Sequence, residues 1–312
     1  MKDIEDAPRT TKDLRVVGLT GPRVQTAVED ACTWLTADDR INRSDIVDLR
    51  PHLLLAEVAN PREMAEERLT ELVAYVREAD SSAALWLSDI AHSAACPYSI
   101  RDLFDAVFCA DPGLWFGAIG LPHAASRQAL SAEEAQSDEG VGLVVEAIEH
   151  WDVQFSPRLE PLMAAAAEHP FAVLAMEPRA PGLPTQLEPL ARAGRDDDDR
   201  VSFIRQLGVI VSASPTQASA LYMPAVVFDA VALGVPVVIA QPVSGGLLPH
   251  GVVGLAAQDA PSELIDRALT DGEFGPGMRD AGRRSVRHGH TYVHRLATAA
   301  SAVGFTVMPS YG

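Results

Sequence analysis

The chain has 312 residues, 47% of them hydrophobic and 22% charged, which is the composition of a globular protein long enough for two domains of about 150 residues each. Its formal net charge of −18 disfavours nonspecific binding to nucleic acid, because the phosphate backbone attracts basic surfaces. No apolar run reaches the roughly 18 residues that a membrane span requires, and the N-terminus is polar rather than signal-like. We therefore expect a cytoplasmic protein with no membrane span.

The first part of the chain is predicted to alternate strands and helices. Apolar strands are expected at residues 14–19, 52–59, 83–89, 103–111 and 115–122, and helices at 24–36 and from 61 to about 79. Helices interleaved with apolar strands predict a parallel sheet that is covered on both faces. The polar segment at 126–140 lacks strand periodicity, and we interpret it as a linker between two domains.

The same alternation restarts after this linker. Strands are expected at 141–147, 171–176, 207–214 and 235–241, helices at 156–169, 224–234, 261–269 and 277–304, and a short helix with a solvated acidic turn at 181–200. The predicted fold class is α/β, with two Rossmann-like domains facing each other across a cleft. The domains are expected at 1–130 and 138–312, and the terminal helix is expected to lie close to the cleft or to cross back onto the first domain.

Two stretches carry a resemblance to a known family. Residues 224–239 read PAVVFDAVALGVPVVI and follow a strand that ends in small polar residues, and residues 290–295 read HTYVHR. Both are similar to motifs of GT-B glycosyltransferases, most closely of the CgeB-like spore-protein glycosyltransferases. In the first half, LRPHLLLAEV, LFDAVFCADPG and LPHAAS resemble segments of the same family. The resemblance implies an acceptor-side domain at 1–130 and a nucleotide-sugar donor domain at 138–312.

The donor site that this resemblance implies centres on Asp229, which stands where the family has Glu and would accept hydrogen bonds from the nucleotide ribose. Val226 stands where the family often has Arg, so a positive charge is missing. Ligands of doubly wound sheets lie beyond the carboxyl ends of the strands, and backbone and cationic groups there stabilise phosphates. The further predicted donor contacts are Ser212, Ser214, Thr216, Gly245, Gly246 and Arg158. Arg158 is equally well explained as a surface residue, and the glycines as a plain turn.

Sugar transfer usually requires a base for the acceptor hydroxyl. Asp89 and His92 follow an apolar strand of the first half, and the aspartate would either orient the histidine or act alone. Asp89 is equally well explained as a turn or helix cap. His123 is more simply a hinge or packing residue than a catalyst.

The histidines near the C-terminus have the spacing of a metal site without its chemistry. His290 and His294 are four residues apart, but the run HTYVH lacks the Glu that follows the first histidine in the zinc motif H-E-x-x-H. We expect these histidines to pack and cap a terminal helix and to bind no metal. Tyr292 is expected to bury its ring, and Arg295 to reach a carboxylate or the donor phosphates.

The predicted function is metal-independent transfer of a sugar from a nucleotide sugar to an unidentified acceptor, with no cofactor besides the donor. A second hypothesis is a catalytically degenerate binding or partner protein, because of the changes at Asp229 and Val226 and the lack of a glycine-rich loop after 141–147. A sugar-nucleotide epimerase is disfavoured, because no G-x-G-x-x-G follows a strand. The sugar, the acceptor and the choice between a homo-oligomer and a partner protein stay open.

Overall fold

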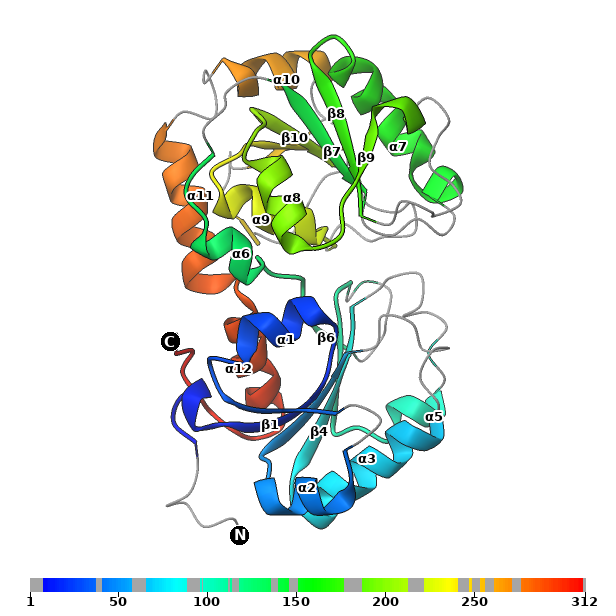
Figure 1. Ribbon diagram of the computed structural model, residues 1–312, viewed down its shortest axis with the longest axis vertical. Helices are drawn as coiled ribbons and strands as arrows, with labels where there is room; N and C mark the ends of the chain where they lie inside the picture. Colours follow the sequence, from blue (N-terminus) through cyan, green and yellow to red (C-terminus); the bar gives the residue numbers. More distant parts are fainter. Residues whose placement is uncertain are drawn as a thin grey trace. The chain divides into compact units, whose positions relative to one another are not determined.

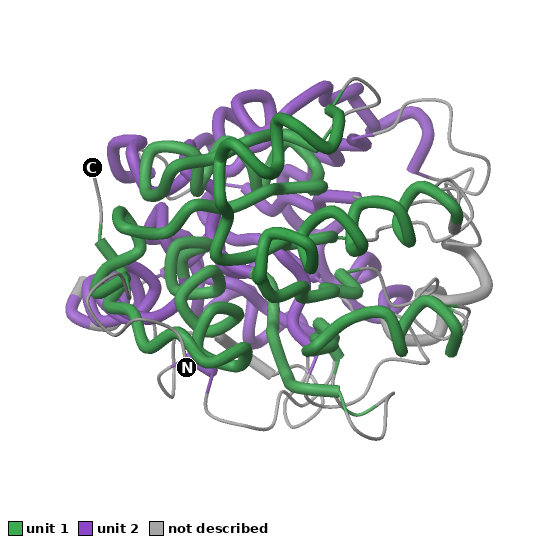
Figure 2. The backbone as a smooth tube through the Cα atoms, turned by 90° about the horizontal axis from the view of Figure 1, so that it is seen from below, with its two compact units in different colours: residues 1–123, 291–312 green, residues 124–290 purple. Residues whose placement is uncertain are grey.

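In the computed structural model the chain divides into two units. Unit 1 contains Met1–His123 and Thr291–Gly312, and unit 2 contains Ala124–His290 (Figure 2). The structure describes residues 8–37, 41–57, 66–88, 96, 98–111, 113, 118–135, 140–145, 151–176, 187–212, 222–240, 247–248, 253–255, 261–270 and 276–310. At 66, 151–158, 253–255, 276 and 278 it describes the backbone alone.

Unit 1 is built on a six-stranded sheet in which every pairing is parallel (Figure 1). The strand order is β2-β1-β3-β4-β5-β6. The strands are β1 (Arg15–Leu19), β2 (Thr33–Thr36), β3 (Leu53–Glu57), β4 (Ser82–Leu87), β5 (Ala106–Cys109) and β6 (Ile119–Gly120). The helices are η2 (Thr11–Asp13), α1 (Pro22–Val28), α2 (Arg43–Leu49), α3 (Glu66–Glu78), α5 (Tyr98–Arg101) and α12 (Tyr292–Ala302). The chain order reverses between β1 and β3, where ligands of open parallel sheets bind.

Unit 2 contains a second six-stranded, entirely parallel sheet. Its order is β12-β11-β10-β7-β8-β9. The strands are β7 (Val141–Val145), β8 (Phe171–Ala175), β9 (Ala191–Ala193), β10 (Val209–Ser212), β11 (Val237–Ile239) and β12 (Val253–Leu255). The helices are α6 (Arg127–Ser131), α7 (Trp151–Ala166), η4 (Glu188–Leu190), α8 (Asp197–Ile204), α9 (Ala225–Ala232), α10 (Pro261–Leu269) and α11 (Pro276–Gly289). Numbered within the unit, this order is the 3-2-1-4-5-6 arrangement of dinucleotide-binding sheets, with its reversal between β7 and β10.

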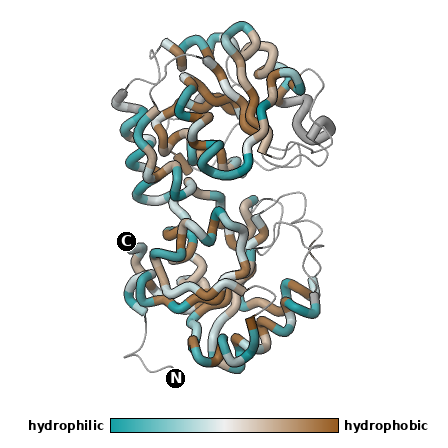
Figure 3. The backbone as a smooth tube through the Cα atoms, viewed as in Figure 1, coloured by the Kyte–Doolittle hydropathy of each residue, from teal (hydrophilic) through white to brown (hydrophobic). Residues whose placement is uncertain are grey.

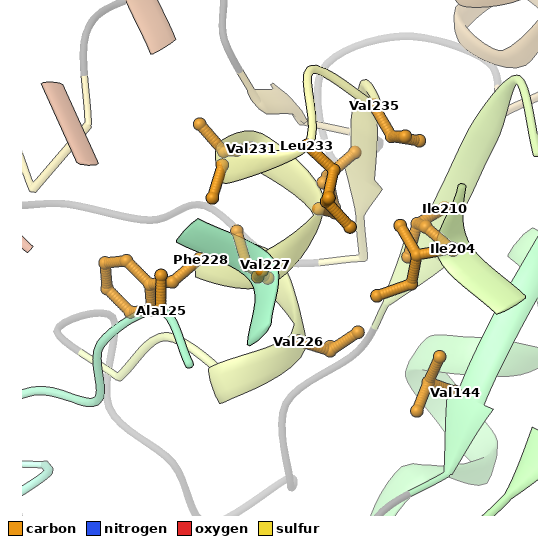
Figure 4. Close-up of a cluster of buried hydrophobic side chains, with 14 of the residues drawn as sticks. Ala125, Val144, Ile204, Ile210, Val226, Val227, Phe228, Val231, Leu233 and Val235 are labelled. Atoms are coloured by element: carbon orange, nitrogen blue, oxygen red, sulfur yellow. The ribbon is translucent and has the colours of Figure 1, made fainter. Parts of the chain in front are cut away.

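The strands β7, β10 and β11 of the unit 2 sheet are buried on both faces, as period-two alternation in a covered parallel sheet requires. Val144 and Ile210 point to one face and pack with α8, α9 and α11, in the cluster that Figure 4 shows in part. Their neighbours Val145 and Val211 point to the other face and pack with α7 and α10. The strands of both sheets accordingly contain much of the most hydrophobic sequence (Figure 3).

Helix α9 is buried along its whole length and ends where the sequence predicts. All eight of its residues are buried. Gly234 follows with φ +77°, a left-handed conformation that costs other residues about 1–2 kcal/mol. Val235 N then donates to Ala230 O at 2.8 Å, so the chain turns directly into β11. This helix-turn-strand segment, which carries the family resemblance, lies in the buried core of unit 2.

Two local predictions were wrong, and each has a physical reason. Residues 33–36, expected to be helical, form the edge strand β2, because the β-branched and aromatic run Thr-Trp-Leu-Thr suits an extended strand. The acidic run expected in a solvated loop forms the start of α8, where Asp196 caps the helix by accepting from Asp199 N. Carboxylates are favoured there because the helix N-terminus carries partial positive charge.

The extent of the two units differs from the expected domains of 1–130 and 138–312. Unit 2 begins at Ala124, so α6 belongs to it rather than to the first domain or a linker. The single helix expected at 277–304 is two helices: α11 is part of unit 2, and α12 is part of unit 1. None of the helices in the described part of the chain is long and apolar enough to cross a membrane.

Candidate functional site

The structure describes few of the predicted site residues in full. Asp89, His92, Ser214, Thr216, Gly245 and Gly246 lie outside the described residues, and Arg158 lies in α7 at a position where only the backbone is described. Ser212 and Asp229 are described completely, so the structure reports directly on these two.

Ser212 is the last residue of β10 and lies at the carboxyl edge of the unit 2 sheet. The Ser212 carbonyl accepts a hydrogen bond from Ala240 N at 3.0 Å, and Ser212 is paired in register with Ile239 of β11. Since β10 is one of the two strands between which the order reverses, Ser212 is located where ligands of such sheets bind. Its side chain is buried.

Asp229 has a structural environment that differs from the predicted one. Its side chain is 0% exposed. One carboxylate oxygen accepts from Ser126 N at 2.7 Å, and the other accepts from Arg200 Nε at 2.9 Å. Arg200, 4% exposed, also pairs with Asp197 in α8. This buried network joins α6, α8 and α9.

The predicted ribose contact of Asp229 is therefore wrong for this arrangement. A carboxylate without exposed surface, and with both oxygens engaged inside unit 2, does not reach a nucleotide. Its actual cation, Arg200, stands 29 residues earlier in an acidic run, and no local pattern in the sequence connects the two.

The HTYVHR segment has packing and capping roles. Thr291 caps α12 by accepting from His294 N, and its hydroxyl lies 2.8 Å from His294 Nδ1. Tyr292 is 2% exposed, with its ring centroid 5.8 Å from that of Trp86. Arg295 donates to the carbonyls of Pro122 and His123 at 2.7 and 2.8 Å, and its expected contact with a carboxylate or the donor phosphates stays a prediction. His290 of unit 2 packs on Phe228, with ring centroids 5.5 Å apart.

His123 is partly buried, and its ring centroid lies 6.0 Å from that of Trp86, which agrees with its interpretation as a packing residue. Among the described residues no group of three or more His, Cys, Asp and Glu side chains is placed to hold a metal ion.

A polar group that the sequence did not reveal lies at the carboxyl edge of the unit 1 sheet. Glu57 ends β3, and its Oε2 accepts from Gly21 N, between β1 and α1, at 2.9 Å. Burial raises the pKa of the Glu57 carboxyl, while hydrogen bonds from Gly21 N and the Ser88 hydroxyl, and the charge of Arg23, oppose that rise. The sequence feature that could have indicated this group is an acidic residue at the end of an otherwise apolar strand.

Arg23 is held in this region by α12. Its Nε donates to the Tyr292 hydroxyl at 3.0 Å, and its guanidinium carbon lies 5.8 Å from the centroid of the Tyr292 ring. The terminal segment therefore positions the cation whose charge acts on Glu57.

No protein-family model matches the sequence, and no curated protein matches it. Solved structures do match the fold. Anabaena HepE, in a structure with UDP and glucose, is 12% identical with a TM-score of 0.53, and the match covers 93% of this chain and 99% of that one. An alpha-glucosyltransferase in complex with UDP and a 13-mer DNA is 8% identical with a TM-score of 0.61, covering 91% and 96%. The lipopolysaccharide outer core galactosyltransferase WaaB, in its apo form, is 9% identical with a TM-score of 0.50, covering 92% and 98%.

These matches extend over nearly the whole of each chain, and both parallel sheets contribute to the likeness. The predicted α/β class with two Rossmann-like domains is confirmed: the chain has the fold of GT-B glycosyltransferases.

Proposed function

We propose that the protein is a glycosyltransferase that moves a sugar from a nucleotide-sugar donor to an acceptor hydroxyl. The observation that carries the proposal is the pair of parallel six-stranded sheets, matched over more than 90% of the chain by glycosyltransferases whose structures contain UDP. The resemblance of residues 224–239 and 290–295 to CgeB-like proteins supports a finer proposal, membership of that family.

In this proposal unit 2 binds the donor at the carboxyl ends of β7 and β10. Ser212, Ser214, Thr216, Arg158, Gly245 and Gly246 remain the proposed contacts to the nucleotide and its phosphates. The leaving diphosphate is stabilised by backbone N–H groups and by arginine, without a metal. UDP is the first nucleotide to test, because two of the matched structures contain it.

Binding is measured by the shift in melting temperature with UDP and with a panel of nucleotide sugars, each with and without EDTA. A ligand at about 100 times its dissociation constant stabilises the protein by about 2.7 kcal/mol. We expect a response to at least one nucleotide sugar that EDTA leaves unchanged, and that Thr216→Val weakens. Thr270→Val is the matched control, because Thr270 is an exposed residue that follows α10. A response that EDTA abolishes would contradict metal independence.

A catalytically degenerate partner protein is the second candidate, and one observation favours it. Asp229, which stands at the acidic position of the donor motif, is buried against Arg200 and leaves that position without a carboxylate for the ribose. This candidate predicts nucleotide binding without turnover, or neither.

A further inference from the structure

We infer that Glu57 is the catalytic base of the reaction, which takes the proton of the acceptor hydroxyl at the carboxyl edge of the unit 1 sheet. The inference rests on the proposed function. It places the base at Glu57, and not at Asp89 or His92, which the sequence predicted for this role.

The place of Glu57 in the sheet supports this role. Leu19 is paired in register with Ala56, so Thr20 and Glu57 leave adjacent strands at the same level, where the chain order reverses between β1 and β3. Thr20 Oγ1 is a buried atom with no hydrogen-bond partner among the described residues. A buried hydroxyl of this kind usually has a partner, so Thr20 Oγ1 is, within the described part of the chain, an unsatisfied polar group at the same edge of the sheet as Glu57.

The carboxylate is also held in one orientation. Oε2 accepts from Gly21 N at 2.9 Å, and the Ser88 hydroxyl donates to the same carboxylate. Both of these donors are neutral, and they fix the orientation of the carboxylate. Glu57 is partly exposed as a residue, in contrast to the fully buried Asp229.

Two opposing effects act on the pKa of Glu57. Desolvation favours the protonated form and raises the pKa of Glu57, whereas Arg23, held by Tyr292, favours the carboxylate. A general base is most effective when its pKa approaches the working pH. Arg23 from α1 is the charged group that acts on Glu57 among the described residues, and Ser88 and Gly21 are the neutral ones.

The transfer step forms one bond and breaks another. The acceptor oxygen forms a bond to the anomeric carbon of the donor, and the bond from that carbon to the phosphate oxygen breaks. Its electron pair leaves with the nucleoside diphosphate, and the acceptor proton moves to the Glu57 carboxylate.

The test uses the full chain, with UDP-glucose as donor and water as acceptor, and measures UDP release between pH 4 and 9. Glu57→Gln keeps an oxygen for Gly21 N but cannot take a proton. We expect it to lower the rate by about 10²–10⁴-fold, to remove the rise in rate with increasing pH, and to leave the Kd for UDP-glucose within about twofold. Asp105→Asn is the matched control, because Asp105 Oδ2 accepts from Ala83 N at 2.8 Å at the opposite edge of the same sheet.

Four outcomes are distinguishable. A Glu57→Gln rate within threefold of the wild type, or an unchanged pH profile, overturns the assignment of Glu57. Loss of the pH dependence in His92→Gln with its retention in Glu57→Gln assigns the base to His92 instead. If the Glu57→Gln protein does not fold, Glu57→Asp is measured in its place. A pH dependence of the rate that is retained but shifted in Glu57→Asp supports the role of Glu57 as the base. A wild type that neither binds nor turns over UDP-glucose or any other nucleotide sugar overturns the proposed function itself.

Discussion

Glu57 of unit 1 and Asp229 of unit 2 are carboxylates with similar partners and different surroundings. Each accepts a backbone N–H, at 2.9 and 2.7 Å, and each has an arginine in its vicinity. Asp229 is completely buried and bonded directly to Arg200, whereas Glu57 is partly exposed and the charge of Arg23 lowers its pKa. A direct, desolvated ion pair fixes a fold, while a carboxylate bound by neutral donors at a sheet edge keeps its capacity to take a proton.

Removal of the buried carboxylate is the largest expected perturbation. Asp229→Ala removes the buried carboxylate that pairs with Arg200 and accepts from Ser126 N, which costs about 3–5 kcal/mol. The measurement is amide hydrogen exchange of peptides from α8 and α9, because a chain of two units need not unfold in a single step. The control is Asp198→Ala, an exposed change in α8, the helix that contains Arg200, and it should cost about 1 kcal/mol or less. Equal exchange in the two variants would show that the ion pair contributes nothing.

A double-mutant cycle measures the coupling free energy between Arg200 and Asp229. Arg200→Met removes the cation that pairs with the buried Asp229 carboxylate, and Asp229→Asn removes the charge that pairs with Arg200, so each change should destabilise unit 2 on its own. In the double variant, Arg200→Met with Asp229→Asn, the loss of unfolding free energy should be smaller than the summed losses of the two single variants. We expect a difference of about 0.5–3 kcal/mol, because the residues are in direct contact. Additive effects would contradict the direct pairing.

In unit 1 the expected stability effect is smaller. Tyr292→Phe removes the acceptor of Arg23 Nε but keeps the ring against Trp86, so we expect a loss of about 0.5–1.5 kcal/mol. Exchange of the α12 peptide reports the change. Tyr98→Phe serves as the control, because Tyr98 is 77% exposed. A loss as large as that of Asp229→Ala would mean that unit 1 also depends on a buried polar network.

The smallest expected effect is a shift in pH dependence. Arg23 lowers the pKa of Glu57, so Arg23→Gln removes that influence and the pKa rises further. The active form of the base is the carboxylate, and the rise in rate should therefore move to higher pH, with the plateau rate at high pH little changed. The pH profile of UDP release measures this. A profile that moves to lower pH would contradict the assignment of Glu57 as the base.

The sequence predicts those parts of the fold that depend on continuous apolar runs. The strands β3, β7 and β10 are covered on both faces, so their runs of Leu, Val and Ile are unambiguous. The exposed edge strand β2 and the helix α8 were missed, because an edge strand lacks such a run and an acidic helix start looks like a loop. Neither the Asp229–Arg200 pair nor the contact of Glu57 with Gly21 is visible in sequence, since the paired residues are 29 and 36 positions apart.

The most direct test of the glycosyltransferase proposal is the release of nucleoside diphosphate by the wild-type chain from a panel of UDP-, GDP- and dTDP-sugars. Each is measured beside Glu57→Gln and Asp229→Asn. We predict release above the uncatalysed rate with at least one donor, loss of that release in Glu57→Gln, and its retention in whatever fraction of Asp229→Asn is folded. No release and no binding with any donor would contradict the proposed function.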